Sequence, residues 1–233
     1  MPVFNVKPLL VAASVGAAAL SASYAGIIAQ YDLTQSLQDQ SGNGAPDLVN
    51  NGGVLTAAGL TFGANEGPTF TGSLGAGDVY TITMVLNISD ALNDDDWRKL
   101  IDFDDLVLDD GFYLTTDNKF GLYEDVNISD LVAEGPDEVV YNTDLTIVLQ
   151  RTAAHVVTAS VNGVQQFAYQ GAADYGLAES VLHFFQDDDD TSNSEVFSGT
   201  LVSLTIEGGA TAVPVPAAAL LFAPALLAMR RRR

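Results

Sequence analysis

Between about residue 26 and residue 208, apolar and polar residues alternate with a period of two rather than 3.6. In DVYTITMVLNIS, alternate residues from Tyr80 to Ile88 are apolar, and the positions between them are mostly polar. DLTIVLQRT (Asp144 to Thr152) alternates in the same way, and SGTLVSLTIEGG predicts a last strand. Such alternation is typical of strands that bury one face and expose the other.

The segments between these strands are rich in glycine, asparagine and aspartate. In HVVTASVNGVQQFAY, Asn162 and Gly163 separate two strand-like runs and predict a type I′ hairpin, because both residues accept positive φ. Weaker candidates bring the expected total to about ten to fourteen short strands, and no segment of this region has helical spacing. Many short strands with polar turns predict an all-β sandwich or jelly roll of two antiparallel sheets.

The N-terminal residues have the arrangement of an export signal. Lys7 precedes an apolar run from Leu9 to Leu20, and Ser23, Tyr24 and Ala25 form a small-x-small triplet. This arrangement predicts a signal helix over residues 1–25, cleaved after Ala25 by signal peptidase. An ordinary buried helix is the alternative, which the terminal position and the flanking residues disfavour.

The chain ends in VPVPAAALLFAPALLAMRRRR, where a proline motif precedes a short apolar run and an arginine cluster. The apolar run is at or below the length that spans a bilayer, so residues 217–233 predict only a marginal transmembrane helix. The positive-inside rule places the arginines on the cytoplasmic side. The candidate sorting and processing residues are Val213, Pro214, Val215, Pro216, Ala217, Arg230, Arg231, Arg232 and Arg233.

An export signal combined with this C-terminal block resembles the PEP-CTERM family of bacterial sorting signals, in its VPLPA-type variant. The resemblance implies a tail held in the inner membrane of a Gram-negative bacterium and processed by an exosortase near Pro214 to Ala217. The protein would then reach the cell surface or the extracellular matrix. Val215 departs from the family, which has an acidic residue between the prolines. A plain single-span anchor without processing is the alternative.

Charge and cysteine content narrow the possible partners and the sources of stability. The chain has 30 acidic and nine basic residues, and five of the basic residues lie in the two terminal signals. A surface this acidic repels nucleic acid and anionic lipid headgroups and suits high salt or divalent cations. The sequence contains no cysteine, so an exported domain must be stabilised by burial or by bound metal rather than by disulfides.

The region 26–208 is most simply one domain, followed by a linker with the VPVP motif at 209–216. Its opening, YDLTQSLQDQSGNGAPDLVNNGGVLTAAGLTFGANEG, resembles laminin-G-like domains of the concanavalin A-like lectin and glucanase superfamily. There a first strand leads to an Asp-x-Ser-Gly-Asn-Gly turn, here Asp39 to Gly44, and then to a Gly-Leu-x-Phe strand, here Gly59 to Phe62. Three later segments continue the same order. The resemblance implies a concanavalin A-like β-sandwich (jelly roll).

Catalytic chemistry has few candidate residues in this sequence. A retaining glycosidase needs two carboxyl groups about 5 Å apart, and the Glu-x-Asp-x-(x)-Glu strand of laminarinase-like members is absent. The nearest pair is Asp102 with Asp104, which we expect on a solvated strand face or turn. His155 and His183, without any cysteine, supply too few parts for a nucleophilic triad or a transition-metal site. We therefore predict no catalytic residue and no enzyme.

The acidic segment FFQDDDDTSNSE is the candidate metal site. Calcium prefers several carboxylate and carbonyl oxygens, and a bound cation would relieve the repulsion between adjacent acids. The predicted ligands are Asp187, Asp188, Asp189 and Asp190. A solvated hairpin tip is the alternative.

Three aromatic residues, Trp97, Tyr113 and Tyr123, are candidates for stacking a sugar ring, and core or hairpin packing is the alternative for each. Together these features predict an exported, surface-sorted, non-catalytic binding or matrix module associated with extracellular polysaccharide. A purely structural matrix protein without a ligand pocket and a glycan-cleaving enzyme of the same fold remain alternatives, since fold does not decide function.

Overall fold

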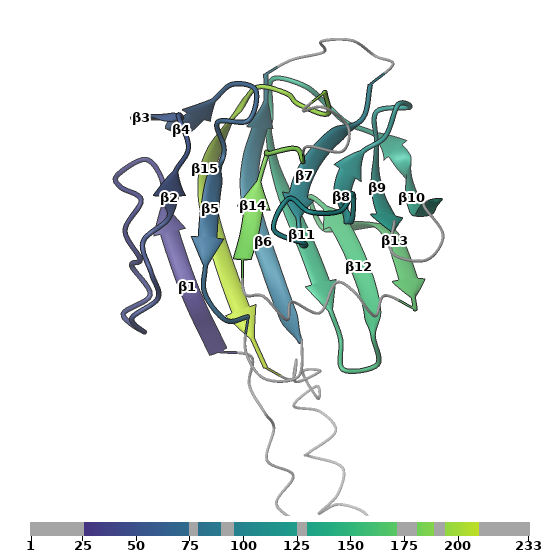
Figure 1. The fold of residues 1–233 in the computed structure, drawn as a ribbon, viewed down its shortest axis with the longest axis horizontal. Coiled ribbons are helices and arrows are strands. Elements are labelled where there is room, and N and C mark those ends of the chain that lie inside the picture. Colours follow the sequence, from purple (N-terminus) through teal and green to yellow (C-terminus); the bar gives the residue numbers. More distant parts are fainter. Residues whose placement is uncertain are drawn as a thin grey trace, which may run out of the picture.

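The structure is a computed structural model that describes residues 26–74, 79–89, 96–124, 130–171, 181–188 and 194–209. Within these ranges the chain forms fifteen strands and no helix, and the strands make two antiparallel sheets (Figure 1). The predicted all-β sandwich is confirmed. The signal segment up to Ala25 and the sorting segment from Val213 lie outside the described residues. In the described part, no helix is long and apolar enough to cross a membrane.

The first sheet, which we call sheet A, contains eight strands in the order β13-β12-β11-β6-β15-β4-β3, with β1 also paired to β15. Its strands alternate between core-facing and outward-facing residues, as the burial of every second residue of β6 shows. The strands of sheet A are β1 (Gly26–Asp32), β3 (Val54–Thr56), β4 (Gly59–Phe62), β6 (Tyr80–Ile88), β11 (Asp144–Arg151), β12 (Val156–Val161), β13 (Val164–Gln170) and β15 (Gly199–Gly208).

The second sheet, sheet B, contains seven strands in the order β10-β9-β8-β7-β14-β5-β2. It packs against sheet A through large apolar side chains, among them Phe112 and Leu114, which are fully buried in the core. The strands of sheet B are β2 (Val49–Asn50), β5 (Pro68–Thr71), β7 (Arg98–Asp102), β8 (Gly111–Leu114), β9 (Lys119–Glu124), β10 (Asp130–Glu138) and β14 (Val181–Phe184).

The strands predicted from alternation occur where they were expected. The predicted strand from Tyr80 is β6, and the one from Asp144 is β11. Asn162 and Gly163 connect β12 to β13 with φ values of 50° and 79°, which confirms the turn with two positive φ angles. The described strands outnumber the expected ten to fourteen because β2 and β3 span only two and three residues, too short to show alternation.

The Asp-x-Ser-Gly-Asn-Gly turn lies along the free edge of β1. Asp39 Oδ1 accepts hydrogen bonds from the backbone N–H groups of Gln30 and Ser41, at 3.1 and 3.0 Å. Ser41 Oγ donates to the carbonyl of Ile28 at 3.3 Å, and the Asn43 side chain donates to the preceding carbonyl of β1 at 2.7 Å. These bonds occupy backbone groups that an edge strand otherwise offers to another chain.

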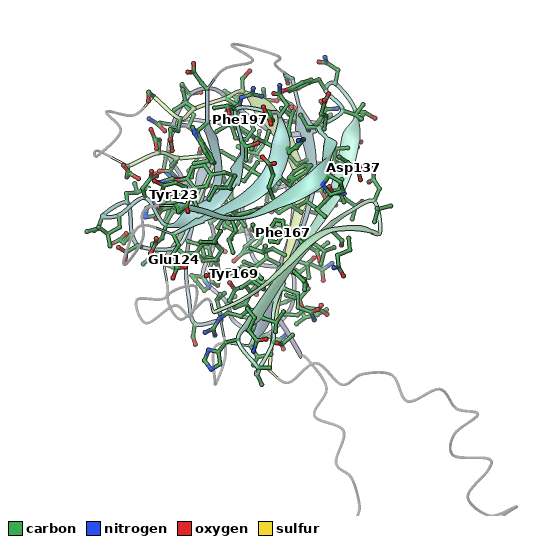
Figure 2. All side chains as sticks on the ribbon, turned by 90° about the vertical axis from the view of Figure 1, so that its right-hand side faces the viewer. Tyr123, Glu124, Asp137, Phe167, Tyr169 and Phe197 are labelled. Atoms are coloured by element: carbon green, nitrogen blue, oxygen red, sulfur yellow. The ribbon has the colours of Figure 1, made fainter. Side chains whose placement is uncertain are left out.

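The opposite side of the sandwich is closed by side chains that join the two sheets. Tyr169 on β13 donates a hydrogen bond to Glu124 on β9, at 3.0 Å, and Gln166 on β13 donates to Asp137 on β10, also at 3.0 Å. Figure 2 shows this side, with Phe167 among these residues. The polar contacts therefore tie the edge of sheet A to sheet B.

The described chain begins and ends at one place in sheet A. Strand β1 pairs antiparallel with β15, and Gly26 lies opposite Gly208. On its other side, β15 pairs with β6 from Gly199 to Gly208. The last strand is therefore held between two neighbours over much of its length.

Candidate functional site

The outer face of sheet B, which points away from the core, is covered rather than solvated. Every residue of β7 and β8 is buried, although only one face of a strand can point into the core. Phe112 and Leu114 take the core face of β8, so Tyr113 points outward and is nevertheless 1% exposed. The segments after β7 and β14 provide this cover, because their residues contact the outward-facing side chains of β7 and β8.

Lys99 on β7 lies under this cover, with its side chain fully buried among carboxylates. Its Nζ atom is 3.3 Å from Asp102 Oδ2, 3.1 Å from Asp109 Oδ1 and 3.8 Å from Asp187 Oδ1. It contacts Asp188 Oδ2 directly and donates a hydrogen bond to it. We call Lys99, these four aspartates and Glu195 the lysine cluster.

The lysine cluster has five carboxyl groups and a single ammonium group. Three of the carboxyl groups, those of Asp102, Asp109 and Glu195, have raised pKa values. Burial raises the pKa of Asp102 and of Asp109, and the charge of Lys99 offsets only part of this effect. Burial, reinforced by the carboxylates of Asp109 and Asp187, raises the pKa of Glu195 to about 8. Burial opposes the charge of Lys99, but the surrounding carboxylates outweigh it and raise the lysine pKa.

Two of the predicted metal ligands are buried and do not lie at a solvated hairpin tip. Asp187 and Asp188 are 3% and 1% exposed, so that alternative is wrong for both of them. Asp109, Asp187 and Asp188 each place an oxygen within 4.8 Å of the others, a spacing that could hold a metal ion. Asp189 and Asp190 lie outside the described residues.

The prediction of a solvated face for Asp102 is also wrong. Asp102 is fully buried and ends β7. Its Oδ1 atom accepts hydrogen bonds from the backbone N–H groups of Asp104 and Leu106, at 3.1 and 2.9 Å, while its Oδ2 atom faces Lys99. Asp102 therefore fixes the turn after β7, and its pairing with Asp104 is a backbone contact rather than a pair of carboxylates.

The three predicted aromatic residues form one group beside the lysine cluster. The Trp97 ring centroid lies 5.6 Å from that of Tyr113 and 5.6 Å from that of Tyr123, and the two tyrosine rings are 6.1 Å apart. Lys99 Nζ lies 5.3 Å from the centroid of Tyr113, which also donates a hydrogen bond to Asp109. Since Tyr113 is buried, a ligand at this group would meet Trp97 and Tyr123, which are half-buried.

A second polar network on sheet B brings together a threonine, a histidine and an aspartate. His183 Nε2 lies 2.8 Å from Asp105 Oδ1, and His183 Nδ1 lies 3.0 Å from Thr69 Oγ1. Thr69 Oγ1 also accepts hydrogen bonds from the amides of Asn51 and Gln186, at 2.9 and 3.1 Å. Because these two bonds use both lone pairs of Thr69 Oγ1, its hydroxyl proton points to His183 Nδ1. His183 Nε2 then carries the ring proton and donates it to Asp105. Thr69 is 6% exposed, and these hydrogen bonds use its hydroxyl fully.

Sequence reasoning missed the residue at the centre of the site. Lys99 was not among the predicted site residues, whereas Glu195 lies in the acidic segment FFQDDDDTSNSE that was predicted to bind metal. The sequence did offer an indication. Only four basic residues lie between the N-terminal export segment and the C-terminal sorting segment, and one of them, Lys99, directly precedes the apolar Leu100 and Ile101. A lysine inside a buried strand requires a charged partner.

Comparison with known proteins shows the fold. No protein-family model matches the sequence, and no curated protein matches it. Domain 4 of AbnA, an extracellular arabinanase from Geobacillus stearothermophilus solved with arabinotriose, is 14% identical, with a TM-score of 0.53 over 81% of this chain and 95% of that chain.

Two further solved structures match parts of larger proteins. A sialidase from Trypanosoma rangeli is 10% identical, with a TM-score of 0.58 over 78% of this chain and 31% of that chain. A structure of botulinum neurotoxin type C, whose cell entry depends on two ganglioside molecules, is 12% identical, with a TM-score of 0.59 over 78% of this chain and 47% of that chain. This chain thus spans less than a third of the sialidase and less than half of the toxin chain. The neighbours are β-sandwich domains, consistent with a concanavalin A-like fold.

Proposed function

We propose that this protein is an exported, non-catalytic module that binds carbohydrate at the cell surface or in the extracellular matrix of a Gram-negative bacterium. Residues 1–25 would direct export, and residues 213–233 would anchor the chain transiently in the inner membrane until an exosortase-type enzyme processes it. A laminin-G-like relationship is part of this proposal and rests on the order of motifs in the sequence.

The observation that carries the proposed ligand class is the aromatic group on sheet B. Trp97 and Tyr123 are half-buried, and the ring of the buried Tyr113 packs edge-on against both. Apolar rings beside fixed polar groups suit a sugar, which has both apolar ring faces and hydroxyl groups. The names of solved neighbours support the same class, because they include an arabinanase domain with arabinotriose and a toxin that interacts with gangliosides.

Binding of the purified full chain to a panel of polysaccharides and glycans tests the proposal. We expect Trp97→Ala to weaken binding by about tenfold, equivalent to about 1.4 kcal/mol. Leu55→Ala is the matched control, since Leu55 is an exposed apolar residue on β3, and it should leave binding unchanged. No binding to any glycan would favour the purely structural matrix protein, and turnover of a glycan would favour the enzyme.

Calcium is the cofactor that we propose for the lysine cluster. The donor set fits a hard cation, because three carboxylates approach one another within 4.8 Å. Lys99 is a single cation among five carboxyl groups whose ionisation burial disfavours, so a divalent ion would favour their ionised forms and reduce their mutual repulsion. Asp109 and Asp187 would be its principal ligands. A comparison of calcium with sodium, described in the Discussion, tests this point.

A further inference from the structure

The contact between Lys99 and Asp188 joins two distant parts of the chain in a site that is closed to solvent. The two residues are 89 positions apart, and both side chains are 0% exposed. Lys99 lies on β7, and Asp188 lies in the segment after β14. Because β14 pairs with β7 at His183 and Asp102, the neighbouring backbone holds the two side chains together.

We propose that Lys99 and Asp188 condense to an intramolecular amide, an isopeptide bond between Lys99 Nζ and Asp188 Cγ. A proton first moves from the ammonium group to the carboxylate along their hydrogen bond, which gives a neutral amine and a carboxylic acid. The amine nitrogen then attacks Cγ, a C–N bond forms, and a C–O bond breaks. The departing oxygen leaves as water with two of the original ammonium protons, so no oxidant, cofactor or activating group is needed.

Burial favours the product of this reaction. A buried ion pair requires two charges to be removed from water, and the penalty is repaid only in part by their attraction. The amide replaces both charges with one neutral group. Tyr113, whose ring lies 5.3 Å from Lys99 Nζ, adds an apolar wall, and the released water can join the bulk solvent.

Asp188 is favoured over the other acids of the lysine cluster by its position. It makes the shortest approach to Lys99 Nζ, whereas Asp109, Asp102 and Asp187 lie 3.1, 3.3 and 3.8 Å away. Asp102 Oδ1 is committed to backbone N–H groups, and Asp187 Oδ2 accepts the backbone N–H of Glu195 at 2.9 Å. Both oxygens are therefore engaged in fixing turns.

Glu195 adds a further buried carboxyl group to the surroundings of the pair. Its Oε2 atom is buried and has no hydrogen-bond partner among the described residues. Its carboxyl group is close enough to Asp188 and Lys99 for their charges to interact.

The amide bond would give this chain a covalent cross-link of a kind that its sequence cannot provide through disulfides. The chain has no cysteine and cannot form a disulfide. An amide between positions 99 and 188 would close a long loop in the unfolded chain, and cross-links of this kind stabilise the folded state mainly by restricting the unfolded one. This inference concerns covalent structure and is independent of the proposed carbohydrate ligand.

Tandem mass spectrometry of the purified full chain after chymotrypsin digestion tests the bond. We expect a fragment containing Lys99 to be joined to one containing Asp188, with a combined mass lower by one water molecule. Asp188→Asn should form the same bond with loss of ammonia instead of water, and Asp188→Ala should give separate fragments. Separate wild-type fragments of full mass, or a bond from Lys99 to a different acid, would overturn the assignment.

Two variants control this experiment. Lys119→Met removes the other described lysine, which lies 3.6 and 3.7 Å from acidic oxygens but is 25% exposed, and it should keep the bond. Glu195→Gln leaves the contact between Lys99 and Asp188 in place and should also keep the bond, and its loss in this variant would overturn direct proton transfer within the pair. The wild-type digest decides the bond itself even where a cluster variant fails to fold.

Discussion

Sheet A and sheet B present outer faces of different character, although both pack their inner faces into the same core. Along β6 in sheet A, buried residues alternate with partly exposed ones, so the outer face is open to solvent. Along β7 and β8 in sheet B, every residue is buried, and the outer face holds a lysine, acids and aromatic rings under covering segments. Burying charge and polar groups costs stability unless they are paired, so the covered face is where a selected function is expected.

Replacing the central cation of the covered face should have the largest effect. We expect Lys99→Met to lower the free energy of unfolding by about 3–5 kcal/mol, because it removes the partner that Lys99 Nζ provides to the buried aspartates, whether as an ammonium group or as an amide to Asp188. Thr83→Ala, on the open face of β6, should change it by no more than about 0.5 kcal/mol. Urea denaturation measures both values. Equal effects would remove the distinction between the two faces.

Two tyrosines that donate to carboxylates allow a finer comparison. Tyr113 is buried on sheet B and donates to Asp109, whereas Tyr169 is half-buried on sheet A and donates to Glu124. Tyr113→Phe should cost about 1–3 kcal/mol, because the carboxylate it leaves is partly desolvated. Tyr169→Phe should cost less than about 1 kcal/mol, because the half-buried Tyr169 leaves its vacated position next to solvent, although its acceptor Glu124 is itself 5% exposed. The ranking would be contradicted if Tyr169→Phe were the more damaging change in urea denaturation.

Calcium should stabilise the covered face specifically. A ligand at tenfold excess over its Kd stabilises the folded state by about 1.4 kcal/mol, from RT ln(1 + [L]/Kd). Millimolar calcium should therefore raise the melting temperature above that in sodium chloride of matched ionic strength. Asp187→Ala combined with Asp188→Ala should remove the difference. Identical melting curves in the two salts for the wild-type protein would show that only general screening operates.

The two sheets should respond to pH with opposite signs. Glu195 has a pKa raised to about 8, so the folded state binds its proton more tightly, and stability falls as pH rises from about 4.5 towards 8. Burial opposes the charge of Asp39 beside β1, but N–H donors outweigh it and lower its pKa. Its contribution is present above about pH 4 and is lost as pH falls further.

Melting temperatures across this pH range, measured with Glu195→Gln and Asp39→Asn, separate the two contributions. Glu195→Gln should flatten the decline above pH 5, and Asp39→Asn should reduce the loss below pH 4. If the melting temperature of Glu195→Gln declined with pH as steeply as that of the wild type, a group other than Glu195 would be responsible for the decline.

Much of the fold was predictable because alternation reports directly on a strand with one buried face. Strands β6 and β11 and the Asn162–Gly163 turn follow from local residue order. β7 could not be assigned a partner or a face by the same rule, since both of its faces are buried. A strand covered on both sides carries no period-two signal.

The candidate site was predictable only in fragments. The runs containing Asp187 and Trp97 stood out because acids and aromatic residues cluster there in the sequence. The burial of Asp187 and Asp188 did not, because it depends on a counter-charge from Lys99, which lies 89 positions before Asp188. Pairing across such a separation is decided by sheet topology, which brings β14 beside β7.

The place of β15 in sheet A has a mechanical consequence. The described chain leaves the sandwich through β15, which is bonded to β6 on one side and to β1 on the other. A tether beyond Gly209 would pull this strand along its own axis. The ladders to β6 and β1 would then be loaded in shear, so that many hydrogen bonds share the force and fail together rather than one at a time. A domain held at a surface by its last strand would resist drag in flowing water better than one peeled from an edge.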